Sequence, residues 1–137
     1  MLRKDYIMKL IQQMIDSLFL LLNKKDMDED ERKEQLSQLY KSYTGEAEIF
    51  YLNTPLKDIL IFLEKEYGQE EVLYRIEMLS EIMYHDGMLE NDPETKKLKL
   101  LKTLSLLNFL EERSNTYSIT RIGKIDKIKS CFAIDYK

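Results

Sequence analysis

Residues Gln69–Arg113 read QEEVLYRIEMLSEIMYHDGMLENDPETKKLKLLKTLSLLNFLEER, and this stretch decides how the rest of the chain must pack. In its first half, apolar residues recur at the period of one helix face. They are Val72, Ile76, Leu79 and Met83, with Leu73 and Ile82 beside them. Its second half has a similar run at Leu98, Leu101, Leu104 and Leu107, widened by Leu100, Phe109 and Leu110. We therefore expect two long helices.

The residues between these runs predict a short turn. Asp86-Gly87 is typical of a helix end, because glycine readily takes the left-handed conformation found there. Asp92-Pro93-Glu94 is typical of a helix start, with Asp92 as the cap and Pro93 at the first helical position. A short connection favours an antiparallel hairpin, which needs further helices to cover its apolar faces.

The composition predicts one folded domain that covers residues 1–137. The chain is 44% hydrophobic and 34% charged, and its four Gly and two Pro leave little punctuation for a many-stranded sheet. We expect an all-α fold, an antiparallel bundle of five or six helices. The tail, residues 131–137, either frays or packs through Phe132 and Tyr136. Since Cys131 is the only cysteine, no intrachain disulfide can form, which indicates the cytoplasm.

Two helices are expected in the first 45 residues of the chain. The first covers residues 6–22, with Asp5 as its cap and an apolar face of Ile7, Ile11, Met14, Leu18 and Leu21. The second starts at Asp28, where Glu31 completes an arrangement like a capping box, and it ends at Gly45. Its apolar face is Leu36, Leu39, Tyr40 and Tyr43.

The remaining segments carry weaker signals. Thr54 as cap and Pro55 at the first position predict a helix that Gly68 closes. Residues 46–53 hold a four-residue apolar run that could be a helical turn or an extended piece. Residues 114–116 break the helix before them, and Ser118 or Thr120 caps a final short helix. There Ile119, Ile122, Ile125 and Ile128 recur every third residue.

The first helix carries more apolar surface than one neighbour needs, because Phe19 and Leu20 lie outside its main apolar face. It is therefore either central or part of a dimer contact. Polar residues interrupt it too often for a membrane span of ~20 apolar residues, so no membrane is expected. Binding to a membrane surface is a lesser alternative, which its mixed-charge polar face disfavours.

The charge of the chain is divided unevenly. Residues 1–92 hold 11 Lys/Arg and 20 Asp/Glu, a net charge of −9, and residues 93–137 hold 10 and 5, a net charge of +5. The basic part contains Lys96, Lys97, Lys99, Lys102, Arg121, Lys124, Lys127 and Lys129. With the motif Thr-x-x-Gly at 120–123 it could be the end of a winged helix, which would make the protein a DNA-binding regulator. The acidic chain, with pI ≈ 5.2, makes nucleic acid unlikely as a partner.

Residues that could carry chemistry are few. Cys131 and His85 are each the only residue of their kind, and nothing local pairs them for nucleophilic catalysis. Glu77, Glu81 and His85 recur every four residues and could hold a metal, but di-iron bundles need a second such helix. The pair Glu70-Glu71 fits the start of a helix, and the pair Glu111-Glu112 has no functional explanation. We predict no catalytic, cofactor-binding or metal site, no enzyme and no cofactor.

Two stretches resemble known families. The opening Met-Leu-Arg-Lys-Asp-Tyr-Ile and the amphipathic helix after it resemble an uncharacterised family of small bacterial all-helical proteins, a domain of unknown function. The hairpin is similar to a tetratricopeptide repeat, with Ile76, Leu79, Met83 and Leu101 near its core positions and Gly87 at the end of its first helix. Ser80 and Leu104 stand where that repeat has small residues, and one repeat does not make a solenoid.

These observations predict a non-catalytic protein-interaction or structural module of the cytoplasm. Its partner would be another protein, held as a helix or peptide between helices, or a second copy bound through the first helix. The alternatives are a DNA-binding regulator that uses the basic part, and a helical protein that binds a small ligand or a metal.

Overall fold

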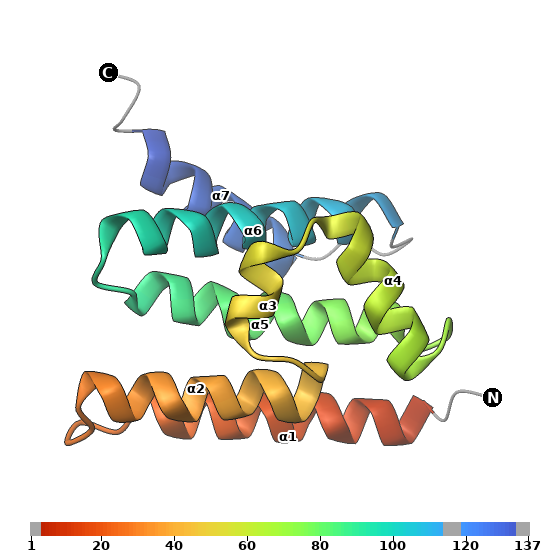
Figure 1. Ribbon diagram of the computed structural model, residues 1–137, viewed down its shortest axis with the longest axis horizontal. Helices are drawn as coiled ribbons and strands as arrows, with labels where there is room; N and C mark the ends of the chain where they lie inside the picture. Colours follow the sequence, from red (N-terminus) through yellow and green to blue (C-terminus); the bar gives the residue numbers. More distant parts are fainter. Residues whose placement is uncertain (1–3, 114–118, 134–137) are drawn as a thin grey trace. The chain divides into compact units, whose positions relative to one another are not determined.

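The computed structural model describes residues 4–113 and 119–133, and every regular element in them is a helix (Figure 1). The helices are α1 (Lys4–Leu22), α2 (Glu29–Thr44), α3 (Glu48–Asn53), α4 (Leu56–Tyr67), α5 (Val72–Leu89), α6 (Pro93–Arg113) and α7 (Ile119–Ala133). The prediction of an all-α fold is confirmed. The described residues form seven helices rather than five or six, because the unassigned stretch around residues 46–53 contains α3.

The chain folds into two compact units, residues 1–82 and 83–137, and α5 runs from the first into the second. The first unit holds 11 Lys/Arg and 17 Asp/Glu, and the second holds 10 and 8, so the charge asymmetry follows this division. That the chain is a single domain stays a prediction. Residues 131–133 of the expected tail are helical, and residues 134–137 lie outside the described part.

In the first unit, α1 and α2 lie side by side as an antiparallel pair (Figure 1). Asp28 caps α2 as predicted, since its Oδ1 accepts a hydrogen bond of 2.8 Å from the Glu31 N–H. Such a cap stabilises a helix by about 1 kcal/mol. Gly45 ends α2 with φ +94°, a left-handed conformation that favours glycine. Asp5 is not a cap, because α1 begins one residue earlier, at Lys4.

An aromatic cluster lies between α3 and α4, still in the first unit. The Phe50 ring centroid is 5.1 Å from that of Tyr51 and 4.9 Å from that of Phe62. Tyr51 is fully buried, and its hydroxyl donates a 2.6 Å hydrogen bond to the Thr44 carbonyl at the end of α2. This bond satisfies one of the carbonyls that a helix end leaves without a partner.

The predicted cap at Thr54 is wrong. Its hydroxyl donates back to the Phe50 carbonyl, in the preceding helix, at 2.5 Å. Pro55 occupies the capping position of α4, and no side chain caps that helix. Gly68, with φ +92°, ends α4 as expected.

In the second unit, the end of α5, a short turn and α6 form the predicted antiparallel hairpin. Asp92 caps α6, since its Oδ2 accepts from the Thr95 N–H at 3.0 Å and from the Thr95 hydroxyl at 2.7 Å. The helix end predicted at Asp86-Gly87 is wrong, because α5 continues to Leu89. A Cβ atom on Gly87 would lie 2.8 Å from Cδ2 of Leu100, so this glycine lets α5 and α6 approach closely.

The predicted apolar face of α6 is confirmed in part. Leu100, Leu107 and Leu110 are buried as predicted, whereas Leu98 and Leu101 are 58% and 43% exposed. The buried side also includes Lys99, Thr103 and Leu106, which were not predicted there. Leucines occur around most of this helix, so their spacing alone could not distinguish the buried side from the exposed one.

Helix α7 packs against α6 in the second unit. Ile125 and Ile128 are buried, as their three-residue spacing predicted. Thr120 lies inside α7 and does not cap it, and Ser118 and the break at 114–116 lie outside the described residues. Residues 120–123, which a winged helix would place at the end of its strand, are helical.

Candidate functional site

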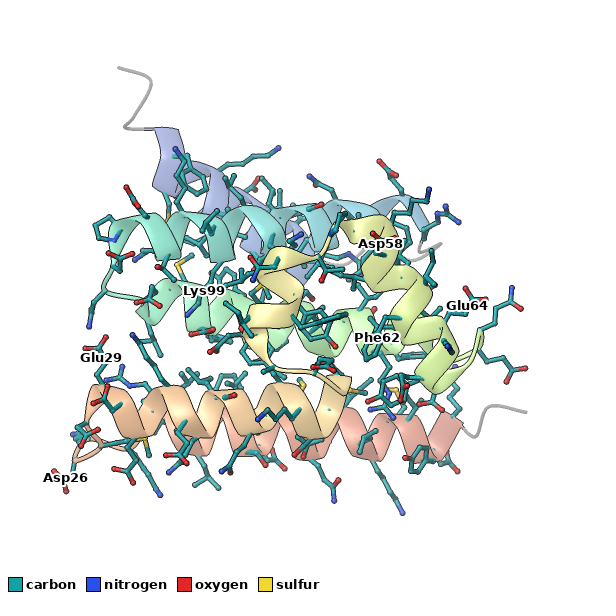
Figure 2. The ribbon with its side chains drawn as sticks, viewed as in Figure 1. Asp26, Glu29, Asp58, Phe62, Glu64 and Lys99 are labelled. Atoms are coloured by element: carbon teal, nitrogen blue, oxygen red, sulfur yellow. The ribbon has the colours of Figure 1, made fainter. Side chains whose placement is uncertain are left out.

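Lys99 forms a buried ion triad in the second unit, and the sequence analysis missed it. Lys99 is labelled in Figure 2. Its Nζ lies 3.0 Å from Oδ1 of Asp86 and 2.7 Å from Oε1 of Glu90. All three side chains are at most 5% exposed. The second oxygen of Glu90 accepts from the backbone N–H groups of Asn91 and Asp92, at 3.1 and 3.2 Å. The triad therefore joins α5, the turn and α6.

The carboxylates of the triad keep Lys99 charged despite its burial. Burial alone lowers the pKa of Lys99, but the hydrogen bond to Glu90 and the charge of Asp86 raise it more, so the pKa lies above its ordinary value. A lysine in this state is a donor of hydrogen bonds and holds its proton firmly. We interpret the triad as a structural connection rather than a proton-transfer site.

Arg75 is a buried cation that links helices of the first unit. Its Nη1 donates a 2.7 Å hydrogen bond to the Tyr43 carbonyl at the end of α2. Its Nε and Nη2 donate to Oε1 of Glu71 at 3.1 and 2.9 Å, and its guanidinium carbon lies 3.8 Å from the centre of the Tyr67 ring. Burial raises the pKa of Tyr67, although the charge of Arg75 opposes this. One side chain thus links α2, α4 and α5.

The two carboxylate pairs also have structural roles. Glu71 of the first pair receives Arg75, as described above. In the second pair, Glu111 forms an ion pair with Arg121 and so joins α6 to α7. The structure thereby explains Glu111, which the sequence left unexplained.

The candidate catalytic and metal-binding residues lie on α5 and near the end of α7. His85 is half-buried with its ring 5.1 Å from the neighbouring Tyr84 ring, and Cys131 is half-buried near the end of α7. Glu77 and Glu81 are half-buried on α5. In residues 4–113 and 119–133 no group of three His, Cys, Asp or Glu side chains could hold a metal ion.

Several of the predicted basic residues are engaged within the second unit. Lys99 and Arg121 lie in the ion pairs described above, and the Lys96 Nζ donates to the Met88 carbonyl at 3.2 Å. Lys124 lies 5.6 Å above the Tyr84 ring, and burial lowers the pKa of Lys102. Lys97, Lys127 and Lys129 are exposed. Of the eight predicted basic residues, Lys99 and Arg121 are thus held in ion pairs and three are exposed.

Two open hollows lie within the units. One of about 310 Å³ lies between the start of α6 and the end of α7, and Pro93, Leu100, Cys131 and Phe132 line it together with Glu94, Lys96 and Lys97. The other, of about 550 Å³, lies between α1 and α2 and is lined mostly by polar residues of α2, with Ser17 and Leu21 from α1. Neither contains a set of convergent buried polar groups of the kind that fixes a small ligand.

One side of α1 presents a line of partly exposed apolar residues, which we name the α1 side face and define as Met8, Ile11, Ile15, Phe19 and Leu22. These residues are spaced by three, four, four and three positions, so they form one line along the helix. Met8 is 51% and Phe19 44% exposed, and the other three are half-buried. The fully buried side of α1, with Ile7, Met14, Leu18 and Leu21, is a different side.

No family model, curated protein or solved structure matches this chain. The two resemblances read from the sequence thus stay predictions. Gly87, which aligned the hairpin with a tetratricopeptide repeat as the end of its first helix, lies inside α5. Within the described part of the chain, none of the helices combines the length and the apolar character that a membrane crossing requires.

Proposed function

We propose that this protein is a non-catalytic interaction module that binds an amphipathic protein helix along the α1 side face. The observation that carries this proposal is the partial exposure of five apolar side chains in one line. Isolated exposed apolar residues are common on protein surfaces, but a continuous line of them along a helix is typical of a binding face.

The spacing of this face supports a helix as the bound element. A line of anchors at three- and four-residue intervals runs nearly parallel to the axis of α1, which has 19 residues and a length of about 28 Å. A second amphipathic helix presents a complementary line at the same intervals. Covering Met8 and Phe19 would remove apolar surface from water, which stabilises by roughly 25 cal/mol per Å².

The use of the charged side chains supports a role without catalysis. Lys99, Asp86 and Glu90 hold the hairpin, and Arg75 with Glu71 joins three helices. Groups engaged in this way are held by their partners, and removal of one partner leaves a buried charge uncompensated, which fits a structural role better than a reactive one. The single Cys131 supports the cytoplasm as the compartment, as part of the same proposal.

Photo-crosslinking tests this proposal. A benzophenone side chain replaces Met8 in the full chain, and the matched control carries it at Lys33, which is exposed and charged on α2. After irradiation in the cells that produce the protein, we expect a crosslinked product of defined mass from position 8, at least about tenfold stronger than from position 33. Mass spectrometry of the product identifies the crosslinked peptide.

A uniform crosslinking pattern from both positions, or no product from either, would remove the support for the α1 side face. A second variant, Phe19→Glu, should abolish the product from position 8 while the helical circular dichroism spectrum stays unchanged. This control separates loss of the binding face from loss of the fold.

A further inference from the structure

The spacing of the residues in the α1 side face is the same in both directions along the helix. Its five residues are spaced by three, four, four and three positions, and Ile15 is at the centre. If a second α1 runs antiparallel to the first about a two-fold axis through Ile15, every apolar residue meets an apolar residue. Met8 then lies level with Leu22, Ile11 with Phe19, and Ile15 with its own copy.

The charges at the two ends of this line fit the same arrangement. Lys4 precedes Met8 by four residues, and Asp26 follows Leu22 by four residues. The antiparallel pairing that aligns the apolar residues brings the start of one α1, which holds Lys4, to the end of the other α1, which the turn containing Asp26 follows. Asp26 is exposed at the outer end of the turn between α1 and α2 (Figure 2), and Lys4 is exposed at the start of α1.

A second pair of charges lies at the same two ends, since Asp5 is in the first turn of α1 and Lys25 is in the turn after it, and both residues are exposed. An antiparallel pair therefore brings Lys4 and Asp5 of one copy to the end where the other copy has Lys25 and Asp26. A parallel pairing would instead place Lys4 and Asp5 beside their own copies, which is unfavourable. The charges at the two ends of α1 therefore favour an antiparallel second copy.

We propose that the partner of the α1 side face is a second copy of this chain, paired antiparallel about a two-fold axis at Ile15. This inference rests on the proposed function and identifies the partner that binds the α1 side face. A two-fold contact uses the same patch on both copies, as this face allows. One helix side is smaller than a standard interface of ~800 Å² per partner, so we expect a dimer that dissociates in the micromolar range.

Disulfide crosslinking of the full chain tests the register. In a Cys131→Ser background, Ile15→Cys places one thiol of each copy beside the two-fold axis. Under mild oxidation we expect it to form a covalent dimer at least about tenfold faster than Lys33→Cys, the matched control on the exposed surface of α2. Disulfides form only between Cα atoms about 4.4–6.8 Å apart, so the reaction reports the register.

Two further variants test the direction of pairing. Met8→Cys and Leu22→Cys should each react slowly alone, and their equimolar mixture should give the mixed dimer at least about fivefold faster. Faster reaction of Met8→Cys with itself than with Leu22→Cys would indicate a parallel pair and overturn the proposal. Light scattering of the wild-type chain should show a mass that rises towards the dimer between about 1 and 100 μM, the range that a micromolar Kd sets.

A strict monomer over this range, or no excess of the Ile15→Cys dimer over the control, would also overturn the second copy as partner. This failure differs from failure of the proposed function. If position 8 crosslinks to a different protein, the proposed function stands and the self-association falls. If position 8 gives no specific product at all, both fall.

Discussion

Among the described residues, Arg75 is a buried cation of the first unit and Lys99 and Arg121 are buried cations of the second, and Arg75 and Lys99 are held in different ways. Arg75 in the first unit uses its planar fork on one carboxylate and one backbone carbonyl, and its face lies on the Tyr67 ring. Lys99 in the second unit is a point charge between two carboxylates, Asp86 and Glu90. The first arrangement is neutral overall, whereas the second has an excess negative charge, which the backbone N–H groups of the turn partly offset.

This difference shows why the lysine is the more vulnerable of the two. A guanidinium spreads its charge over several donors and an aromatic face, so loss of one contact leaves the others in place. A lysine that neutralises two buried carboxylates has one charged group only, so no other part of its side chain replaces a lost contact. The second unit therefore depends more on one side chain than the first unit does.

The largest expected effect comes from removing these cations. Lys99→Met should lower the free energy of unfolding by about 3–5 kcal/mol, because two carboxylates are left buried and close together. Arg75→Met should cost less, about 2–3 kcal/mol, because one carboxylate, Glu71, loses its cation, together with the Tyr43 carbonyl and the Tyr67 ring. Urea titration followed by circular dichroism measures both, and Lys97→Met, at an exposed lysine on the same helix, should change stability by under about 0.5 kcal/mol.

Equal losses for Lys99→Met and Arg75→Met would contradict this contrast between the units. Replacing the whole triad, as Lys99→Met with Asp86→Asn and Glu90→Gln, should recover most of the stability that Lys99→Met alone loses. Hydrogen exchange resolved by peptide sharpens the comparison further. Faster exchange confined to residues 83–113 would indicate two independent units, and faster exchange throughout would support the predicted single domain.

Much of the fold could be predicted from the sequence because its signals are local. Asp28 and Asp92 accept hydrogen bonds from N–H groups three residues ahead, and Gly45 and Gly68 end helices with a conformation that favours glycine. The apolar face of α5 at Ile76, Leu79 and Met83 is also buried as predicted. Each of these features depends on residues within one or two turns of the chain, so spacing and residue type suffice.

The ion triad and the exposure of Leu98 and Leu101 on α6 could not be predicted in the same way. Lys99 meets partners 13 and 9 residues away across a turn, and its position among leucines gave no sign that it was buried. One signal was present, since Lys99, Thr103, Leu106 and Leu110 also recur at helical spacing. That line includes two polar residues, so the leucine line beside it was the stronger pattern.

Alanine substitutions at Gly87 and Gly123, which lie within helices of the second unit, should change the stability by intermediate amounts and in opposite directions. Gly87→Ala places a Cβ 2.8 Å from Leu100 Cδ2 and 3.3 Å from Lys99 Cβ, and overpacking of this kind costs about 1–3 kcal/mol. The better helix propensity of alanine offsets up to about 1 kcal/mol of that cost, so a net loss of about 1 kcal/mol is expected. At Gly123, which is exposed with nothing within 4 Å, alanine should instead stabilise by about 0.5–1 kcal/mol.

Thermal unfolding of both glycine variants checks this prediction. Stabilisation by Gly87→Ala would show that α5 and α6 do not approach closely at this residue. The opposite signs are informative because both substitutions make the same chemical change in a helix. Only the neighbouring helix differs between them.

The smallest expected effect is the change in the free energy of unfolding at alkaline pH. The pKa of Lys99 is raised in the folded protein, because its two carboxylates outweigh the cost of its burial, and burial also raises the pKa of Tyr51. A group with a raised folded pKa contributes stability that is complete below its unfolded pKa and is lost as pH rises from there through the folded pKa. The unfolded pKa values of lysine and tyrosine are about 10.4 and 10, so we expect stability to change by under about 0.5 kcal/mol between pH 8 and pH 9.5 and to fall above that.

Urea titrations at several pH values measure this pH dependence, with Tyr51→Phe and Lys99→Met as separate variants. Each variant should make the alkaline decline shallower than in the wild-type chain. A decline that both variants leave unchanged would assign it to other groups, whereas a shallower decline in Lys99→Met alone would show that the triad in the second unit, and not the tyrosine in the first, limits stability at high pH.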